Sequence, residues 1–539
     1  MTARIPSISR RQIATEALES RSLLSTAYYI SPSGSDLNSG LTPETAWQTV
    51  SRVNNTTFAA GDSINFQGGA VFGGPMGFDA NDVGTAAAPI TLTSYGDGRA
   101  VLQGTATAPA LSIFNTGGFN VSNLNFVGAG PTVSSRAGIS VMNRLDGDIT
   151  LEHIYIDDVD VSGFGTYGIN VQASNGNSGF SDVRITDSKL HDNLLGGIIT
   201  YGPWGEDKTN YAKTLRNVYV GNVEIYSNCG NPGATETTGN GIVLGGVDGG
   251  VVERSVVRDN GDLGGWTAGI WCFNSNNVTF QHNESYRNRT ANAYDGDGFD
   301  FDWNTTNSLM QYNYSHDNDG AGYLLWNITG RPASSGNVVR YNISENDGRR
   351  NKDAGIHVGG PVDNTEIYNN TVYVTPSSTG SPAAAKVADW TGTGLHFRNN
   401  IFQTTGGVPL ADVVVGNKKD FVFQGNDYWS TGGAFQIRYN NRTYKNLASF
   451  QAAGQEKLNG KSVGSSADPL LTRPGQGGTI GNAELLYTLT AYQLRSDSPL
   501  RNSGLNLLSL FGINTGEEDF YGNATPLGAG YSMGAHELA

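Results

Sequence analysis

Repetition is the sequence feature that most constrains how this chain can fold. Six segments between residues 183 and 346 alternate apolar and polar residues and then end in asparagine. The closing residues are Asn193, Asn228, Asn260, Asn288, Asn318 and Asn346, spaced by 35, 32, 28, 30 and 28 residues. A second series opens with glycine and alternates with period two, as in GIVLG (241–245), GIWCF (269–273), GFDFDW (298–303), GYLLW (322–326) and GIHVG (355–359). Each repeat therefore contains two short strands.

Two short strands per repeat, with turns between them, predict a parallel β-solenoid. A fold of alternating strands and helices would need amphipathic segments of ~10–15 residues between the strands, and the sequence shows none. Asparagine suits solenoid turns because it tolerates a left-handed backbone and because stacked amides can hydrogen-bond between turns. For the same reason we interpret Asn277, Asn283, Asn313 and Asn342, each in an Asn-x-Ser/Thr triplet, as turn residues.

Composition agrees with this fold and argues against several classes of protein. The chain has 539 residues, of which 73 are glycine and only 15% are charged. Its net charge of −15 argues against an electrostatic nucleic-acid binder. The sequence lacks the long apolar run that a membrane span requires. Two cysteines, Cys229 and Cys272, cannot build a disulfide framework.

The glycine series also predicts which side chains point into the solenoid, because neighbouring residues of a strand face opposite sides. The first and third positions after glycine are apolar and are expected to be buried; they include Cys272, Phe299, Phe301 and Tyr323. The second and fourth positions are expected to share one exposed surface; they include Tyr201, Trp271, Phe273, Asp300, Asp302, Trp326 and His357. Aromatic faces stack on sugar rings, so the four aromatic residues are predicted to bind a polysaccharide.

Asp300 and Asp302 form a candidate catalytic pair within this aromatic row. They lie two residues apart on one strand face, which places their Cα atoms ~6.5–7 Å apart. Paired carboxylates at about this separation perform glycoside hydrolysis by retaining or inverting routes. Apolar neighbours and a like charge should raise one pKa, as a general acid requires.

Other polar residues near this pair have candidate roles in binding. His357 lies two repeats further along, close enough to contact the same substrate. Arg350 and Lys352, in the turn before His357, could receive a uronate or sulfate group. Asp295 and Asp297, in the preceding DGDG segment, could hold Ca²⁺ through oxygen ligands, although such a segment is also typical of a turn.

The two ends of the chain resemble secreted right-handed β-helix proteins of the pectate-lyase-like superfamily. The resemblance rests on residues 28–69 and, near the C-terminus, on YQLRSDSPLRNSG (492–504), DFYG (519–522) and MGAHE (533–537). It implies a right-handed parallel β-helix, a capping helix at Thr49–Asn54 and a first turn at Asp62–Phe66. It specifies chemistry poorly, because this fold hosts many activities.

The segment DGFDFDW (297–303) is similar to one calcium-dependent branch of the pectate lyases. That similarity implies a calcium ligand at Asp297 and a catalytic base at the position of His357, where the branch has lysine. The acidic cluster expected in the intervening repeat is absent, because Leu324 occupies its position. The lysine and most of the calcium cage are therefore missing.

We expect four parts along the chain. Residues 1–27 are an export leader or a disordered tail, and residues 28–130 form the N-terminal cap and first turns. Residues 131–430 are the central β-helix with the candidate active-site face, and residues 431–539 hold the last turns and a closing segment. The stretch EALESRSLLSTA (16–27) resembles a leader of exported bacterial proteins, so a secreted or cell-surface location is expected. We also expect the protein to be a monomer.

Three functions remain open from the sequence. The favoured one is a secreted polysaccharide-active glycoside hydrolase that uses Asp300 and Asp302 and requires no cofactor. The second is a polysaccharide lyase with His357 as base and a cation, such as Ca²⁺, held near Asp297. The third is a non-catalytic β-helix that binds glycans or attaches to a surface.

Overall fold

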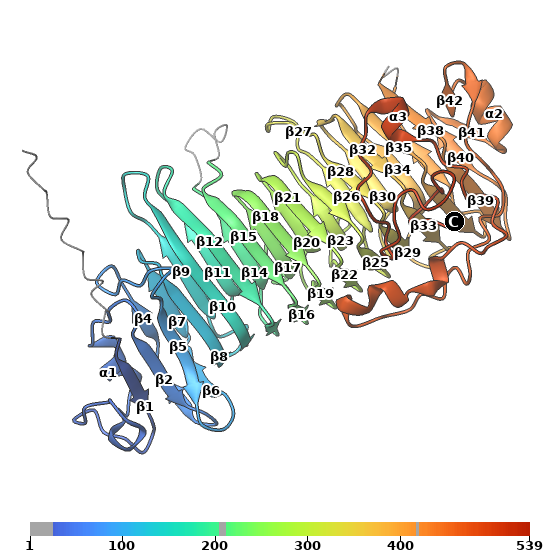
Figure 1. Cartoon of the computed structure of the whole chain (residues 1–539). Coiled ribbons are helices and arrows are strands. Elements are labelled where there is room, and N and C mark those ends of the chain that lie inside the picture. The colour runs from blue at the N-terminus through green and yellow to red at the C-terminus, as the bar shows by residue number, and fades with distance from the viewer. Residues whose placement is uncertain (1–24, 204–211, 417–419, 539) are drawn as a thin grey trace, which may run out of the picture.

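The computed structural model describes residues 25–203, 212–416 and 420–538, which form a right-handed parallel β-helix of about 13 turns (Figure 1). Successive turns stack along one axis from the N-terminal to the C-terminal end. The predicted fold is therefore confirmed. None of the helices among the described residues has the length and hydropathy of a membrane-spanning segment.

One sheet of 14 strands carries the glycine series and so positions the candidate site. Its strands, in sheet order, are β4 (Met76–Phe78), β7 (Leu111–Phe114), β9 (Ile139–Asn143), β11 (Tyr167–Ala173), β14 (Gly196–Tyr201), β17 (Asn240–Gly245), β20 (Ala268–Phe273), β23 (Asp297–Phe301), β26 (Tyr323–Trp326), β30 (Ala354–Gly359), β34 (Ala383–Ala388), β37 (Ala411–Val413), β40 (Ile437–Tyr439) and β41 (Arg442–Tyr444). All neighbours are parallel except the last pair, β40 and β41.

A second sheet of 25 strands forms the remaining walls of the solenoid. Its strands, in chain order, are β1 (Ala27–Ile30), β2 (Ser63–Gln67), β3 (Val71–Gly73), β5 (Ile90–Tyr95), β6 (Ala100–Gln103), β8 (Phe119–Val127), β10 (Thr150–Ser162), β12 (Gly179–Thr186), β13 (Lys189–His191), β15 (Leu215–Gly221), β16 (Glu224–Tyr226), β18 (Val247–Glu253), β19 (Val256–Arg258), β21 (Asn276–Gln281), β22 (Glu284–Tyr286), β24 (Leu309–Gln311), β25 (Tyr314–His316), β28 (Val338–Arg340), β29 (Ile343–Glu345), β32 (Thr365–Tyr368), β33 (Thr371–Val374), β35 (Leu395–Arg398), β36 (Ile401–Thr405), β38 (Phe421–Gln424) and β39 (Asp427–Thr431). Two short pairs complete the strands, β27 (Ser334–Ser335) with β31 (Val362–Asp363) and β42 (Lys457–Leu458) with β43 (Lys461–Ser462).

The N-terminal end is closed by the predicted capping helix. Helix α1 (Val50–Asn54) begins after Thr49, whose hydroxyl accepts a hydrogen bond from the Arg52 amide at 3.2 Å. Val50 and Val53 are buried on the core side of this helix. The solenoid starts one strand earlier than expected, because β1 pairs with β2 ahead of the predicted first turn. The Ile30 side chain of β1 is fully buried and so belongs to the core.

Helices and a folded-back segment complete the C-terminal end. Helix α2 (Leu447–Ala452) buries Leu447 and Phe450 against the last turns, and α3 (Leu507–Phe511) lies further along the chain. Three short 3-10 helices cover Pro43–Thr45, Ala483–Thr488 and Thr490–Tyr492. The C-terminal segment packs along the second sheet, where the amides of Ile480 and Gly481 donate to the Glu284 carboxylate at 2.8 and 2.6 Å.

The side chains that the glycine series predicted to be buried form the core. Cys272, Phe299, Phe301 and Tyr323 have no exposed surface and belong to one continuous apolar cluster. Burial raises the pKa of the Cys272 thiol well above its usual value, so this group is protonated and inert at neutral pH. The inward and outward assignment of this sheet is therefore correct.

Two buried ladders of side-chain amides run from turn to turn. The first joins Asn193, Asn228, Asn260, Asn288 and Asn318 in sequence, for example from Asn228 Nδ2 to Asn260 Oδ1 at 2.9 Å. The second joins Asn283, Asn313, Asn342, Asn370, Asn400 and Asn426 in the same way and ends on the Glu456 carboxylate. Most ladder oxygens also accept a backbone amide of the turn before them, as Asn260 Oδ1 does from Asn228 and Asn313 Oδ1 does from Asn283, so both ladders satisfy buried polar groups.

The structure corrects two details of the predicted turns. The left-handed backbone belongs to the residue before each ladder position, as at Asp259 (φ 54°) before Asn260. Asn346 is such a residue (φ 56°), and the first ladder continues to Asp347, whose Oδ1 accepts from Asn318 Nδ2 at 2.9 Å. The Asp347 carboxylate also accepts hydrogen bonds from the Asn318 backbone amide and the Ser344 hydroxyl. Because an aspartate takes the place of an asparagine here, the spacing of asparagines alone did not reveal this position.

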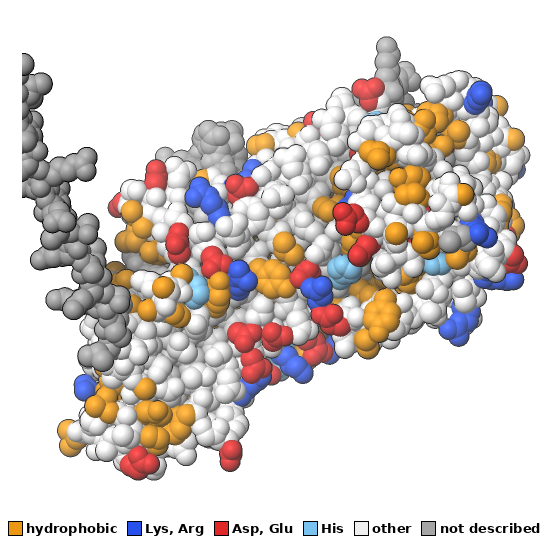
Figure 2. Space-filling view, in the orientation of Figure 1, with side chains coloured by type: hydrophobic (Ala, Val, Ile, Leu, Met, Phe, Trp, Pro, Cys, Tyr) orange, Lys and Arg blue, Asp and Glu red, His pale blue; other side chains and the backbone are white. Residues whose placement is uncertain are grey.

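The lateral face over β13, β16, β19 and β22 carries alternating acidic and basic side chains (Figure 2). These charges pair between turns: Arg258 contacts Glu224 at 2.7 Å, and Arg287 contacts Asp259 at 2.7 Å. Cations on this face are therefore neutralised by carboxylates of the neighbouring turns.

Removing one ladder amide should destabilise the chain. Asn313→Ala deletes the oxygen that accepts from both the amide and the side chain of Asn283, which leaves buried donors without partners. We expect a loss of about 1–3 kcal/mol, the cost typical of an unsatisfied buried group, measured as a lower midpoint of urea unfolding. Asn125→Ala, at a half-buried strand position outside both ladders, is the matched control and should change the midpoint little. Equal midpoints for the two variants would contradict a structural role of the ladder.

Candidate active site

The outward row of the 14-stranded sheet runs across the middle of the solenoid. Trp271 pairs with Asp300, Asp300 with Leu324, Leu324 with His357, and His357 with Lys386. This is the register expected from the glycine series, extended by Lys386 one turn beyond the last residue assigned. Because neighbouring strands lie ~4.8 Å apart, the row brings residues distant in sequence into one site.

These residues form the floor of a cavity of about 1080 Å³ rather than an exposed surface. Trp271 and Phe273 are each 6% exposed, Asp300 is 7% exposed and His357 is 6% exposed, so the predicted exposure was wrong. The cause lies in the segments before the strands, which also line the cavity and contribute Glu236, Trp266, Tyr294, Asp295, Asn351 and Asp353. Such irregular segments have no periodicity from which their position could be read.

One end of the cavity is aromatic. The ring of Phe273 lies 5.5 Å from Tyr201, 5.3 Å from Trp271 and 5.2 Å from Trp303, measured between centroids. The Trp271 indole donates to Asn240 Oδ1 at 3.1 Å, which fixes its ring. Trp326 also lines the cavity and makes an edge contact with His357 at 5.6 Å. Trp303 was not predicted, because it is the fifth residue after Gly298 and the alternation would place it on the inward side.

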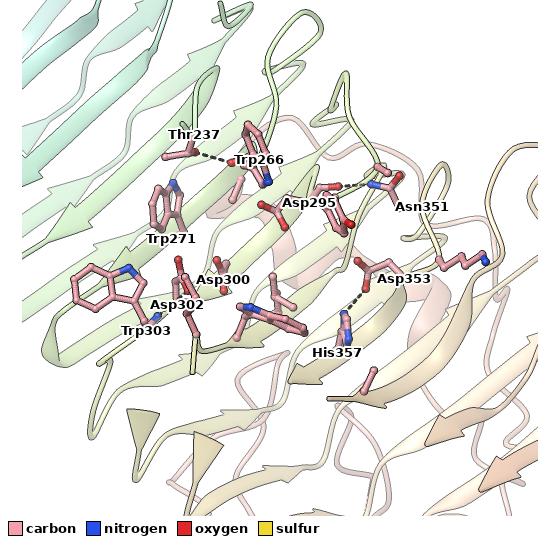
Figure 3. A pocket seen from close by; sticks show the side chains of 18 of the residues that line it. Thr237, Trp266, Trp271, Asp295, Asp300, Asp302, Trp303, Asn351, Asp353 and His357 are labelled. Carbon is pink, nitrogen blue, oxygen red and sulfur yellow. Dashed lines mark hydrogen bonds and ion pairs between the residues drawn. The ribbon is translucent and has the colours of Figure 1, made fainter. Parts of the chain in front are cut away.

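Three carboxyl groups, those of Asp295, Asp300 and Asp302, point into the same space beside these rings (Figure 3). Asp300 lies on β23 and Asp302 follows that strand, whereas Asp295 lies in the turn before it with a left-handed backbone (φ 57°). Asp302 accepts a hydrogen bond from the Trp303 amide at 2.7 Å. Asp300 Oδ1 is buried and has no hydrogen-bond partner among the described residues.

Burial raises the pKa of all three carboxyl groups, and the charges of neighbouring carboxylates add to the shift at Asp295 and Asp300. Burial, followed by the charges of Asp302 and Asp353, raises the pKa of Asp295 to about 8. Burial raises the pKa of Asp302 to about 7, against a lowering by its hydrogen bond to Trp303. Burial and the neighbouring carboxylates raise the pKa of Asp300 well above its ordinary value. The cluster therefore holds protons at neutral pH, which suits acid–base chemistry.

A second titratable pair lies across the cavity, where His357 Nδ1 is 2.8 Å from Asp353 Oδ1 (Figure 3). Burial alone would raise the pKa of Asp353, but the imidazole and the Lys386 ammonium together hold it below its ordinary value. His357 Nε2 is buried without a hydrogen-bond partner among the described residues. The sequence singled out His357 but missed Asp353, which lies four residues before it in a turn.

The remaining predicted site residues separate into two groups. Arg350 and Lys352 line the cavity with Asp295, as binding roles require. Asp297 does not line it: its carboxyl group is fully buried and accepts from the Ala321 amide, and burial raises its pKa well above the usual value. Within residues 25–203, 212–416 and 420–538, no three His, Cys, Asp or Glu side chains are grouped as a metal site would require.

The fold is that of a pectate-lyase-like parallel β-helix protein. No family model matches the chain. A lacto-N-biosidase from Bifidobacterium longum is 26% identical over an alignment that covers 69% of this chain, and the chain spans only 29% of that relative's length.

Two solved structures share the fold. A GH136 lacto-N-biosidase from Eubacterium ramulus superposes with a TM-score of 0.53 at 18% identity, covering 76% of this chain and 68% of the other. The protein XylC, solved in complex with xylose, superposes with a TM-score of 0.51 at 11% identity, covering 95% of this chain and 98% of the other. These similarities establish the β-helix architecture.

The raised pKa of Asp295 makes the stability of the chain depend on pH. In the unfolded chain this carboxyl group ionises near its ordinary value of 3.8, whereas in the folded chain it keeps its proton up to about pH 8. The unfolded state therefore binds fewer protons between these values, and its ionisation costs folding stability as pH rises. Asp295→Asn removes this cost and retains a residue that tolerates the left-handed backbone.

We expect Asp295→Asn to unfold at a higher temperature than the parent near pH 8 and at a similar temperature near pH 4, read from thermal unfolding curves. Asp97→Asn, at an exposed surface bend, serves as the control and should follow the parent at every pH. A difference between Asp295→Asn and the parent that does not grow with pH would contradict the proposed environment of this carboxyl group.

Proposed function

We propose that this protein is a glycoside hydrolase that cleaves a glycan bound in the cavity. The observation that carries the proposal is the group of three carboxyl groups set between aromatic rings on the cavity floor. Sugar rings stack on aromatic faces, and paired carboxyl groups are the usual machinery of glycoside hydrolysis. The similarity to lacto-N-biosidases supports the same reaction class, and it makes lacto-N-biosides the first substrates to test.

In this mechanism Asp295 and Asp302 act as the catalytic pair, and Asp300 supports them. Both acting groups are half-buried and open to the cavity, whereas Asp300 lies deeper on the strand. A general acid works best when its pKa lies near the operating pH, and the values of about 8 for Asp295 and about 7 for Asp302 meet this condition. Burial and the charges of Asp302, Asp295 and Asp353 raise the pKa of Asp300 well above its ordinary value, so this group ionises less readily beside Asp302.

The reaction follows from these protonation states. Asp295 donates its proton to the glycosidic oxygen as the bond to the anomeric carbon breaks, and the Asp302 carboxylate stabilises the positive charge that develops there. Water supplies the hydroxyl group that ends on the anomeric carbon, and its proton restores the acid. The sequence paired Asp300 with Asp302; the structure adds Asp295 to the cluster, and we assign it the role of the acid in place of Asp300.

Substitution of the three carboxyl groups tests this assignment. Asp295→Asn and Asp302→Asn should each lower kcat at least ~10²-fold, the low end for removing a general acid or base, whereas Asp300→Asn should cost less because Asp300 lies deeper and only supports the pair. Activity is measured by chromatography after digestion of a glycan panel that includes lacto-N-biosides. Asp97→Asn is the control and should retain full activity. Activity that survives in both Asp295→Asn and Asp302→Asn would refute the pair.

The same digestion tests the second candidate, a polysaccharide lyase. The buried, unpartnered Nε2 of His357 favours it, because a free imidazole nitrogen facing a cavity can remove a proton. A lyase would leave an unsaturated uronate, detected by its ultraviolet absorbance, and would lose all turnover in His357→Ala. We expect no such absorbance, and a smaller loss in His357→Ala than in Asp302→Asn.

A further inference from the structure

Three cationic side chains line the cavity: Arg350, Lys352 and Lys386. Lys386 lies one turn beyond His357 and donates to the carbonyl oxygen of Lys352, so these two lysines mark the end of the cavity beyond His357. We propose that this end is a subsite for an anionic group of the glycan, a carboxylate or a sulfate. The inference rests on the proposed function only in taking a glycan as the ligand. Arg350 and Lys352 come from the turn before β30, and Lys386 comes from β34, so two separate elements bring the charges together.

The pairing of the strands places this subsite relative to the carboxyl cluster. Lys386 follows Asp300, Leu324 and His357 in the outward row, three turns from Asp300. At ~4.8 Å per turn the two positions lie about 14 Å apart along the axis, which is more than one sugar ring spans. The anionic group would therefore belong to a different sugar from the one whose bond is cleaved.

These three cations are not held in close ion pairs with any described residue. Among the described residues, none of the three forms an ion pair, whereas Arg258 and Arg287 on the lateral face are each paired at 2.7 Å. Instead, Arg350 donates to the carbonyl oxygens of Thr290 and Ala291, and Lys386 donates to the carbonyl oxygen of Lys352. Carbonyl acceptors hold these side chains in place without neutralising their charge, although the Lys386 ammonium also attracts the Asp353 carboxylate.

Two carboxylates also line this end, but they leave a positive excess. Asp353 is directed at His357 at 2.8 Å, and Asp389 is exposed at the rim. At the other end the raised pKa values keep much of the carboxyl cluster protonated, yet an anionic sugar placed there would still meet the negative charge of Asp302. An acidic glycan is therefore favoured in one direction only, with its anionic sugar beside Lys352 and Lys386.

The test measures binding rather than turnover, so it does not depend on the proposed reaction. The protein carrying Asp302→Asn is titrated with matched oligosaccharides by calorimetry: trigalacturonate against galactotriose, and sulfated against unsulfated N-acetyllactosamine. In at least one pair the acidic member should bind more tightly than the neutral member. The pair with the larger ratio of the two affinities shows whether the subsite prefers a carboxylate or a sulfate.

Lys352→Gln and Lys386→Gln, each added separately, should weaken binding of the acidic member about tenfold, the size expected for one hydrogen bond to a charged group, and leave the neutral member unchanged. Lys461→Gln, on exposed strand β43, is the matched control and should alter neither. Any of three results would overturn the subsite. These are equal binding of the acidic and neutral members in both pairs, no binding of either acidic member, and a preference for the acidic member that persists in both lysine variants. If the parent protein hydrolyses no glycan of the panel but the preference for binding the acidic oligosaccharide is intact, only the proposed function is refuted.

Discussion

The stacking of one turn on the next is the constraint on which the rest of this structure depends. Parallel backbone pairing fixes the register, and the buried amide ladders reinforce it because each asparagine oxygen accepts donors of the preceding turn. A shift of one residue would exchange the inward and outward rows. The same register that buries Phe299 and Phe301 therefore sets Asp300 and Trp271 on the cavity floor.

Much of this arrangement could be predicted because period-two alternation and a repeated glycine carry the register in the sequence itself. The positions of Trp271, Asp300 and His357 follow from it directly. Asp295 and Asp353 could not be placed in the site in this way, because they lie in turns of varying length whose path is set by tertiary packing. The enclosure of the site was missed for the same reason: these turns rise around the floor and leave Asp300 only 7% exposed.

Enclosure is what gives the site its chemical character. Carboxyl groups on an open face would ionise near their ordinary pKa. Burial and repulsion by neighbouring carboxylates raise the pKa of Asp295 to about 8, and burial raises that of Asp302 to about 7. The cavity also separates its charges along the solenoid axis, with the carboxyl cluster beside the aromatic rings and Lys386 three turns from Asp300. A linear glycan lying along this axis would contact both ends.

The most direct test of the central claim, hydrolysis by the enclosed carboxyl cluster, is to run the reaction in water enriched in the heavy oxygen isotope. Mass spectrometry of the products then shows where the oxygen of water ends. The account predicts one heavy oxygen atom on the anomeric carbon of the newly released sugar, and no incorporation when Asp302 is replaced by asparagine. Cleavage without incorporation of heavy oxygen would contradict it, because elimination breaks the bond without water.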